Sequence, residues 1–237
     1  MARSENSHET TLRAHFAAAR AERAAARETS VSADDRLAVR RWQQARLATT
    51  HADLLTSSEC GPAARFFLSE LYSTEDLTQR DADIERVIRI LVKFLPDRAL
   101  ATLAAALEMD ALSELLDARL GKVMREQAGD STQALAITTS SYQSAYRTMG
   151  DWELRLRQIA LTEDIGMALD KLARMPLLAG LLRMMRGPAH AAGVGGLHEF
   201  LERGYTAFAQ MKDGRAFIQT IVDRERAEHQ RLTSGEH

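Results

Sequence analysis

Two carboxylates in one stretch of helical sequence, Glu163 and Asp170, are the side chains whose spacing could support acid–base chemistry. Glu163 lies about one turn from Ile159 and from Met167, so a helix would turn it toward its buried side. Two carboxyl groups in a core raise each other's pKa and can then move protons. The alternative, which we favour, is that arginines from neighbouring helices neutralise them. Both residues are therefore candidates for ligand binding, with no catalytic role assigned.

A histidine near the end of an apolar segment offers a second kind of chemistry. His190 is followed by Gly193 and Val194, an order similar to the globin stretch in which a haem-binding histidine precedes the next helix. A neutral imidazole among methionines and phenylalanines is a good ligand for haem iron. Pro188 and the early Gly193 favour the alternative, a histidine in a loop. We predict no cofactor and keep haem at His190 as the alternative.

Metal and thiol chemistry lack the patterns that they need. Di-iron bundles use inward-facing Glu-x-x-His pairs, but here Glu5 and His8 lie in a polar stretch. His198 is followed by Glu199 without the second histidine of a zinc protease site. The lone Cys60 excludes an intramolecular disulfide and favours a reducing compartment. We predict no metal site and no catalytic residue.

The charge balance argues against polyanionic partners. The 237 residues include 31 basic and 33 acidic side chains, which gives a formal net charge of −2. Residues 104–123 have the rhythm of a helix-turn-helix, but Glu114 and Asp117 would repel phosphates. The longest apolar stretch, residues 175–185, is far shorter than the roughly 20 residues of a membrane span. We expect a cytoplasmic protein with no nucleic-acid partner and no membrane partner.

Helices must position these residues, because apolar side chains recur every three or four positions through most of the chain. The clearest stripe consists of Ile84, Val87, Ile88, Leu91, Val92 and Leu95. The sequence predicts an all-α protein, a multi-helix bundle of about seven to nine helices with an N-terminal helical extension. We assign residues 1–59 to the extension and residues 60–232 to the bundle domain.

Several expectations concern where individual helices begin and end. The second helix of the extension is expected over residues 32–55, and a bend is expected near Met109. Residues 132–149 are predicted as helix rather than strand, because the chain offers no partner strand. A short helix over residues 177–185 should stop before Pro188, and the charged end of the last helix should fray.

A nine-residue run carries a family resemblance. Residues 64–72 read ARFFLSELY, which is similar to the motif of a bacterial family of unknown function with an FFLEELYG-like sequence. The resemblance extends over residues 60–225 and implies no activity. Arg65, Arg80 and Asp81, in and after this run, could bind an anion or form a structural ion pair between two elements. We favour the ion pair.

These observations favour a non-enzymatic interaction or regulatory module. Apolar faces that exceed the needs of one core would serve a protein partner or self-association, such as a homodimer. The N-terminal helices and residues 177–185 are the expected contact sites. The alternative is a small-molecule binding protein that holds haem or another tetrapyrrole in a globin-like helical pocket.

Overall fold

The computed structural model describes residues 10–18, 20–21, 24, 30–71, 97–129 and 133–234. Every regular element within these residues is a helix, so the predicted all-α class is confirmed. The apolar stripe over residues 84–95 lies outside the described residues, as do Arg80 and Asp81.

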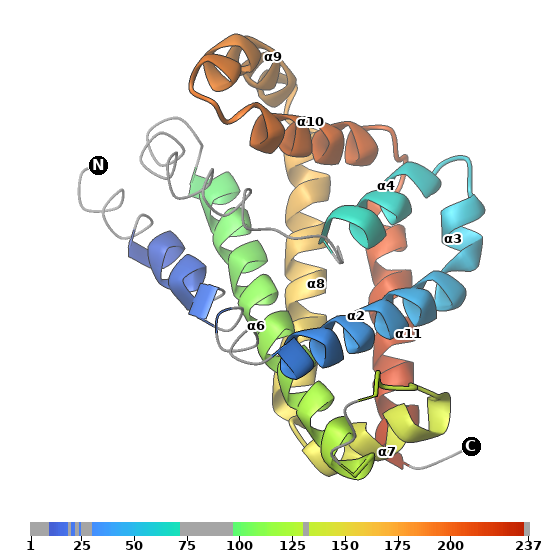
Figure 1. Ribbon diagram of the computed structural model, residues 1–237. Helices are drawn as coiled ribbons and strands as arrows, with labels where there is room; N and C mark the ends of the chain where they lie inside the picture. The colour runs from blue at the N-terminus through green and yellow to red at the C-terminus, as the bar shows by residue number, and fades with distance from the viewer. Residues whose placement is uncertain are drawn as a thin grey trace.

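Residues 10–18 are helical, and ten further helical segments follow, which are labelled in Figure 1 where there is room. Their bounds are α2 Ser30–Thr50, α3 Ala52–Thr56, α4 Gly61–Phe66, the π-helix η1 Phe67–Leu71, α6 Asp97–Gln127, α7 Thr139–Met149, α8 Trp152–Ala173, α9 Pro176–Ala191, α10 Gly195–Ala209 and α11 Gly214–Ser234.

Three long helices, α6, α8 and α11, form the body of the protein (Figure 1). Helix α8 packs against both α6 and α11, and α2 packs across α6. The shorter α7 lies at one end of this body, while α9 and α10 lie at the other (Figure 1). Residues 30–50, which the sequence assigns to an extension, are thus in contact with the bundle.

Apolar stripes on the facing helices build the core. Leu112 and Leu116 of α6 meet Leu161 and Ile165 of α8 in one cluster of buried side chains. A second cluster joins α4, α10 and α11 around Phe66, Phe208 and Phe217, among others. Helices α8 and α11 approach closely because Gly166 has no side chain, and a Cβ there would overlap Ile218. This tight packing fixes the relative positions of α8 and α11.

Two expected interruptions are absent. Helix α6 is continuous from Asp97 to Gln127, so the chain has no break at Met109. Leucines and alanines continue through this region and favour helix on both sides of it. Helix α9 continues to Ala191 although Pro188 lies inside it. Because Pro188 is in the last turn, its missing N–H removes a single backbone hydrogen bond and does not end the helix earlier.

Other boundaries move for local reasons. The helix expected from residue 132 begins at Thr139, because Thr138 and Ser141 form a reciprocal capping box. The helix expected over residues 32–55 breaks at His51, whose backbone has φ −114° and ψ 25°. The last helix remains helical to Ser234, so its charged end does not fray.

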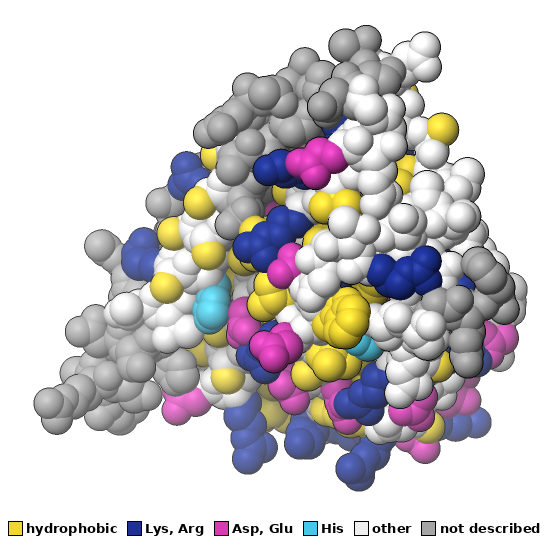
Figure 2. All heavy atoms as spheres, turned by 90° about the horizontal axis from the view of Figure 1, so that it is seen from below, with side chains coloured by type: hydrophobic (Ala, Val, Ile, Leu, Met, Phe, Trp, Pro, Cys, Tyr) yellow, Lys and Arg dark blue, Asp and Glu magenta, His cyan; other side chains and the backbone are white. Residues whose placement is uncertain are grey.

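The surface carries charges of both signs. Figure 2 shows basic and acidic side chains interspersed over one face, with hydrophobic side chains between them. This mixture agrees with the formal net charge of −2.

Candidate functional site

On three helices, polar side chains occupy positions on the inward face that otherwise carry apolar residues. Helix α2 presents Gln43 and Arg46, and His51 follows at its end. The inward face of α8 carries Arg155, Gln158 and Thr162, while that of α11 carries Glu225, Glu228 and His229. Each set recurs at three- or four-residue spacing, so helical geometry turns its members toward the same side.

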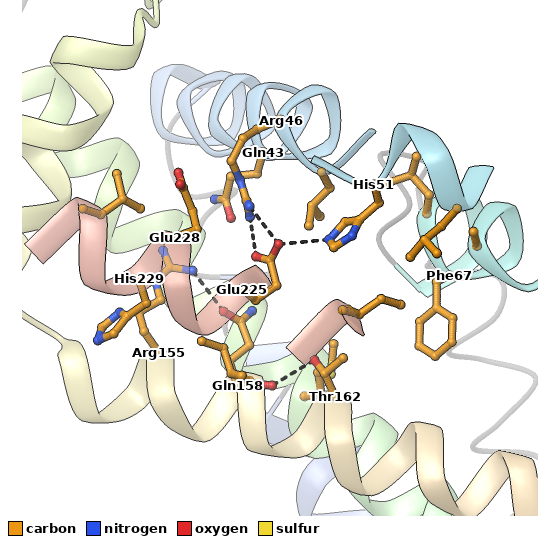
Figure 3. A pocket seen from close by; sticks show the side chains of 18 of the residues that line it. Gln43, Arg46, His51, Phe67, Arg155, Gln158, Thr162, Glu225, Glu228 and His229 are labelled. Carbon is orange, nitrogen blue, oxygen red and sulfur yellow. Dashed lines mark hydrogen bonds and ion pairs between the residues drawn. The ribbon is translucent and has the colours of Figure 1, made fainter. Parts of the chain in front are cut away.

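These side chains line a partly enclosed cavity of about 140 Å³. Figure 3 shows the polar groups reaching into it from α2, α8 and α11. Two tyrosines, Tyr142 and Tyr146, also line it, and the rest of the wall is apolar, from Leu47, Leu54, Leu55, Ala64, Phe67, Leu68, Met109, Ile159, Ile221 and Leu232. The cavity therefore combines an apolar lining with a small number of placed polar groups, as ligand sites do.

A buried cluster of three side chains dominates one end of the cavity. Nη1 and Nη2 of Arg46 donate to the two carboxylate oxygens of Glu225 at 2.9 and 2.7 Å. On the other side of the carboxylate, Nε2 of His51 lies 3.1 Å from Glu225 Oε1. The side chain of His51 reaches Glu225 from the break between α2 and α3, as Figure 3 shows. The carboxylate thus links α11 to two points on the α2–α3 segment.

The surroundings of Glu225 keep it ionised. Burial raises its pKa, but the hydrogen bond from His51 and the charge and hydrogen bonds of Arg46 outweigh burial and lower the pKa to about 2. An ionised carboxylate only accepts hydrogen bonds, so the hydrogen between the two groups resides on Nε2 of His51. In the neutral ring, Nδ1 then holds a lone pair.

The Nδ1 atom of His51 is buried and has no hydrogen-bond partner among the described residues. His51 as a whole is 8% exposed. A buried polar atom of this kind destabilises a fold by about 1–3 kcal/mol when nothing binds it, so it indicates a position for a water or a ligand.

The opposite end of the cavity is built from α7, α8 and α11. The hydroxyl of Tyr146 lies 2.7 Å from Nδ1 of His229. Burial, and after it the charge of Arg155, lowers the pKa of His229, so its neutral ring accepts from the tyrosine hydroxyl. Arg155 donates to Gln158 at 3.1 Å and its guanidinium lies 5.5 Å from the Tyr146 ring centroid. These contacts fix the wall at that end.

A network of buried ion pairs behind the cavity docks α2 onto α6. Glu114 accepts from Arg36 at 2.7 Å and also from Arg40. Deeper still, Gln43 donates to Asp117 at 2.8 Å. Burial raises the pKa of Asp117 despite the opposing charges of Arg40 and Arg155. Glu114 and Asp117, which argue against a DNA-recognition helix, therefore lie inside the protein and connect α6 to α2.

The structure does not bring together the carboxylates singled out in the sequence. Glu163 pairs with Arg226 of α11 at 2.8 Å, while Asp170 pairs with Arg174 at 2.8 Å on its own helix. Their separation of about two turns along α8 leaves each with its own arginine. Neither lines the cavity.

His190 lies at the exposed end of α9. Its Nδ1 is 2.9 Å from the carbonyl oxygen of Arg186, and its Nε2 is 3.5 Å from Glu199. Arg65 of α4 donates to the carbonyl oxygen of Leu55 at 2.8 Å, which ties α4 to α3. Its expected partners Arg80 and Asp81 lie outside the described residues, so the predicted ion pair stays a prediction.

The residues that form the cavity were missed because each occupies a position normally given to an apolar residue. The apolar stripe of α11 ends at Val222, yet the same face continues as Glu225, Glu228, His229 and Leu232. Charged residues in register with an apolar stripe are the signal that could have located the site.

The part of the chain that the structure describes also bears on metal binding, on the thiol and on membrane spans. That part contains no group of three or more His, Cys, Asp or Glu side chains placed to hold a metal ion. Cys60 is a free, half-buried thiol. None of the described helices combines the length and apolar character of a membrane span.

An all-α bundle with an internal cavity is the class that this fold and site define. The chain belongs to the family described as Domain of unknown function (DUF8198), which matches residues 22–237. This confirms the predicted membership in a family of unknown function, over more of the chain than the resemblance covered. No curated protein and no solved structure matches the chain.

Proposed function

We propose that this protein binds a small organic molecule in the cavity between α2, α8 and α11. The observation that carries the proposal is a partly enclosed space of about 140 Å³ beside the buried cluster of Arg46, Glu225 and His51. Apolar packing would stabilise the fold at least as well as buried charges do. Charges retained next to an internal space therefore support a role in recognition.

The size of the cavity limits the ligand. A protein cavity of about 150 Å³ accepts benzene, so a ligand of about six to ten non-hydrogen atoms fits here. A tetrapyrrole, which joins four five-membered rings, exceeds that size. Haem binding thus stays tied to the exposed His190 as an untested alternative.

The proposal is tested by thermal unfolding with benzene, toluene, phenol and cyclohexanol at millimolar concentrations. A ligand that binds only the folded state raises the midpoint temperature as its concentration rises. We expect a concentration-dependent increase for at least one compound in the wild type, and none in Ile159→Trp, whose larger ring fills the cavity. Leu177→Trp, at an exposed position of α9 that does not line the cavity, is the control and should keep the increase. No increase with any of the four compounds would refute the proposal.

A second candidate function, self-association, is supported by the surface of α9. Leu177 and Met184 are 84% and 69% exposed, and they lie about two turns apart on one face of this helix. An apolar stripe of this kind can pack against its copy about a two-fold axis. A protein that binds a small ligand and associates through α9 would suit the regulatory role and the cytoplasmic location that the sequence favours.

Light scattering over a concentration series tests the association. The wild type should show a dimer mass that Leu177→Asp combined with Met184→Asp converts to the monomer mass. Lys122→Asp combined with Arg147→Asp, at exposed positions of α6 and α7, should keep the dimer. A monomer mass for the wild type at every concentration would exclude self-association and leave the cavity proposal untouched.

A further inference from the structure

The cavity carries information about the chemistry of its ligand. The carboxylate near His51 is already held by its neighbours. Both oxygens of Glu225 accept from Arg46, and Oε1 also faces His51. The carboxylate therefore has little left to offer a ligand. Arg46 keeps N–H groups beyond the two that it donates to Glu225, and its Nε is buried without a hydrogen-bond partner among the described residues.

The imidazole of His51 differs from these groups. Its Nε2 is held by Glu225, while its Nδ1 is buried in the cavity wall with no hydrogen-bond partner among the described residues. A carboxylate that fixes one ring nitrogen also fixes the tautomer and the orientation of the ring. The position of a hydrogen-bond acceptor is thus set before any ligand arrives.

The charges at this end of the cavity cancel. Arg46 and Glu225 form an ion pair of one positive and one negative charge, with a shortest distance of 2.7 Å. An anionic ligand would approach Glu225, and a cationic ligand would approach Arg46, in surroundings that exclude water. The side chains beside His51 are apolar and include Leu47, Leu54 and Leu55. A neutral ligand with an apolar body fits these surroundings best.

We infer that the ligand is a neutral, benzene-sized molecule with one hydroxyl or N–H donor, which hydrogen-bonds to Nδ1 of His51, an inference that rests on the proposed binding function. Arg155 lies at the opposite end of the cavity, where it donates to Gln158 and lies near His229, as Figure 3 shows. The body of the ligand lies between the two ends, against the leucines and Ile159.

The test compares phenol with toluene, which has the same ring and size without the donor. Titration calorimetry should show that the wild type binds phenol about tenfold more tightly than toluene. His51→Phe keeps a ring of similar size but has no acceptor, while Glu225 keeps its two hydrogen bonds from Arg46. It should lose the preference for phenol over toluene.

The outcomes separate the two proposals. Equal binding of phenol and toluene by the wild type, or an unchanged preference in His51→Phe, would overturn the inference while the binding function stands. If neither compound binds the wild type, the binding function fails as well. A ¹⁵N spectrum of the wild-type histidines provides a readout that needs no variant. The Nδ1 resonance of His51 should shift upfield with phenol and not with toluene, and a resonance that phenol leaves in place would contradict the inference.

Discussion

Glu225 connects the chemistry of the cavity to the stability of the fold. Its carboxylate receives two hydrogen bonds from Arg46 and faces His51. Removing one partner of a buried pair leaves the other charge without compensation, which is more harmful than the loss of the attraction itself. The residue that orients His51 is therefore also one that the folded state needs in its ionised form.

The pH dependence of unfolding tests this point. Because the pKa of Glu225 is lowered to about 2 from an ordinary value of 4.5, its stabilising contribution is complete above about pH 4.5 and is lost as the pH falls through 2. A shift of this size corresponds to about 3 kcal/mol in the free energy of unfolding. Denaturant titrations should show this loss in the wild type.

The variant Glu225→Gln should be less stable at pH 7 and should show a flatter dependence between pH 4.5 and 2. Glu199→Gln, at an exposed position, is the control and should follow the wild type. Parallel pH profiles for Glu225→Gln and the wild type would mean that this carboxylate titrates normally in the folded protein.

At the scale of elements, buried polar contacts hold helix α2 on α6 beside an apolar cluster that contains Val39 and Leu120. Glu114 of α6 is 1% exposed and receives both Arg36 and Arg40 of α2. Because α2 supplies Arg46 and leads to His51, the docking of this helix sets the geometry of the cavity.

The substitution Glu114→Gln should therefore destabilise the protein strongly. Loss of one partner from a buried ion pair costs about 3–5 kcal/mol, since the arginine charges are left buried. The matched control is Glu108→Gln, which breaks the exposed pair between Glu108 of α6 and Arg157 of α8. We expect the control to lose less than about 1 kcal/mol. Equal losses in urea titrations would show that burial of the Glu114 pair has no energetic consequence.

Helix α7 depends on its cap. The hydroxyl of Thr138 accepts from the backbone N–H of Ser141 at 3.1 Å, and the hydroxyl of Ser141 accepts from the N–H of Thr138 at 3.0 Å. Thr138→Ala should lower the free energy of unfolding by about 1 kcal/mol. Thr139→Ala, one residue into the helix and exposed, should change it by much less. Similar effects of the two substitutions in thermal unfolding would contradict the capping role.

Helix content could be predicted from the sequence, while the helix ends and the site could not. The apolar period identifies α8 and α10, since leucines and phenylalanines mark their buried faces. It does not show that Pro188 is tolerated in a last turn, or that Thr138 and Ser141 delay the start of α7. Glu225 and His51 lie 174 positions apart in the sequence, so only the tertiary fold brings them together.

At the scale of the whole molecule, the cavity lies where α2, α8 and α11 meet without filling the space between them, and residues of α3, α4, η1, α6 and α7 complete its wall. Helices α6 and α8 pack through leucines, and α8 and α11 pack through Gly166. Helix α2 lies across this assembly, and the polar side chains on its inner face keep it from closing onto α8 as an apolar helix would. The space among α2, α8 and α11 follows from this arrangement.

A crystal structure of the protein grown with phenol tests the central claim most directly. We predict density for one ring in the cavity bounded by α2, α8 and α11, with its oxygen within hydrogen-bonding distance of Nδ1 of His51. Density for phenol only on the protein surface, with the cavity filled by side chains or ordered water at saturating ligand, would contradict the account.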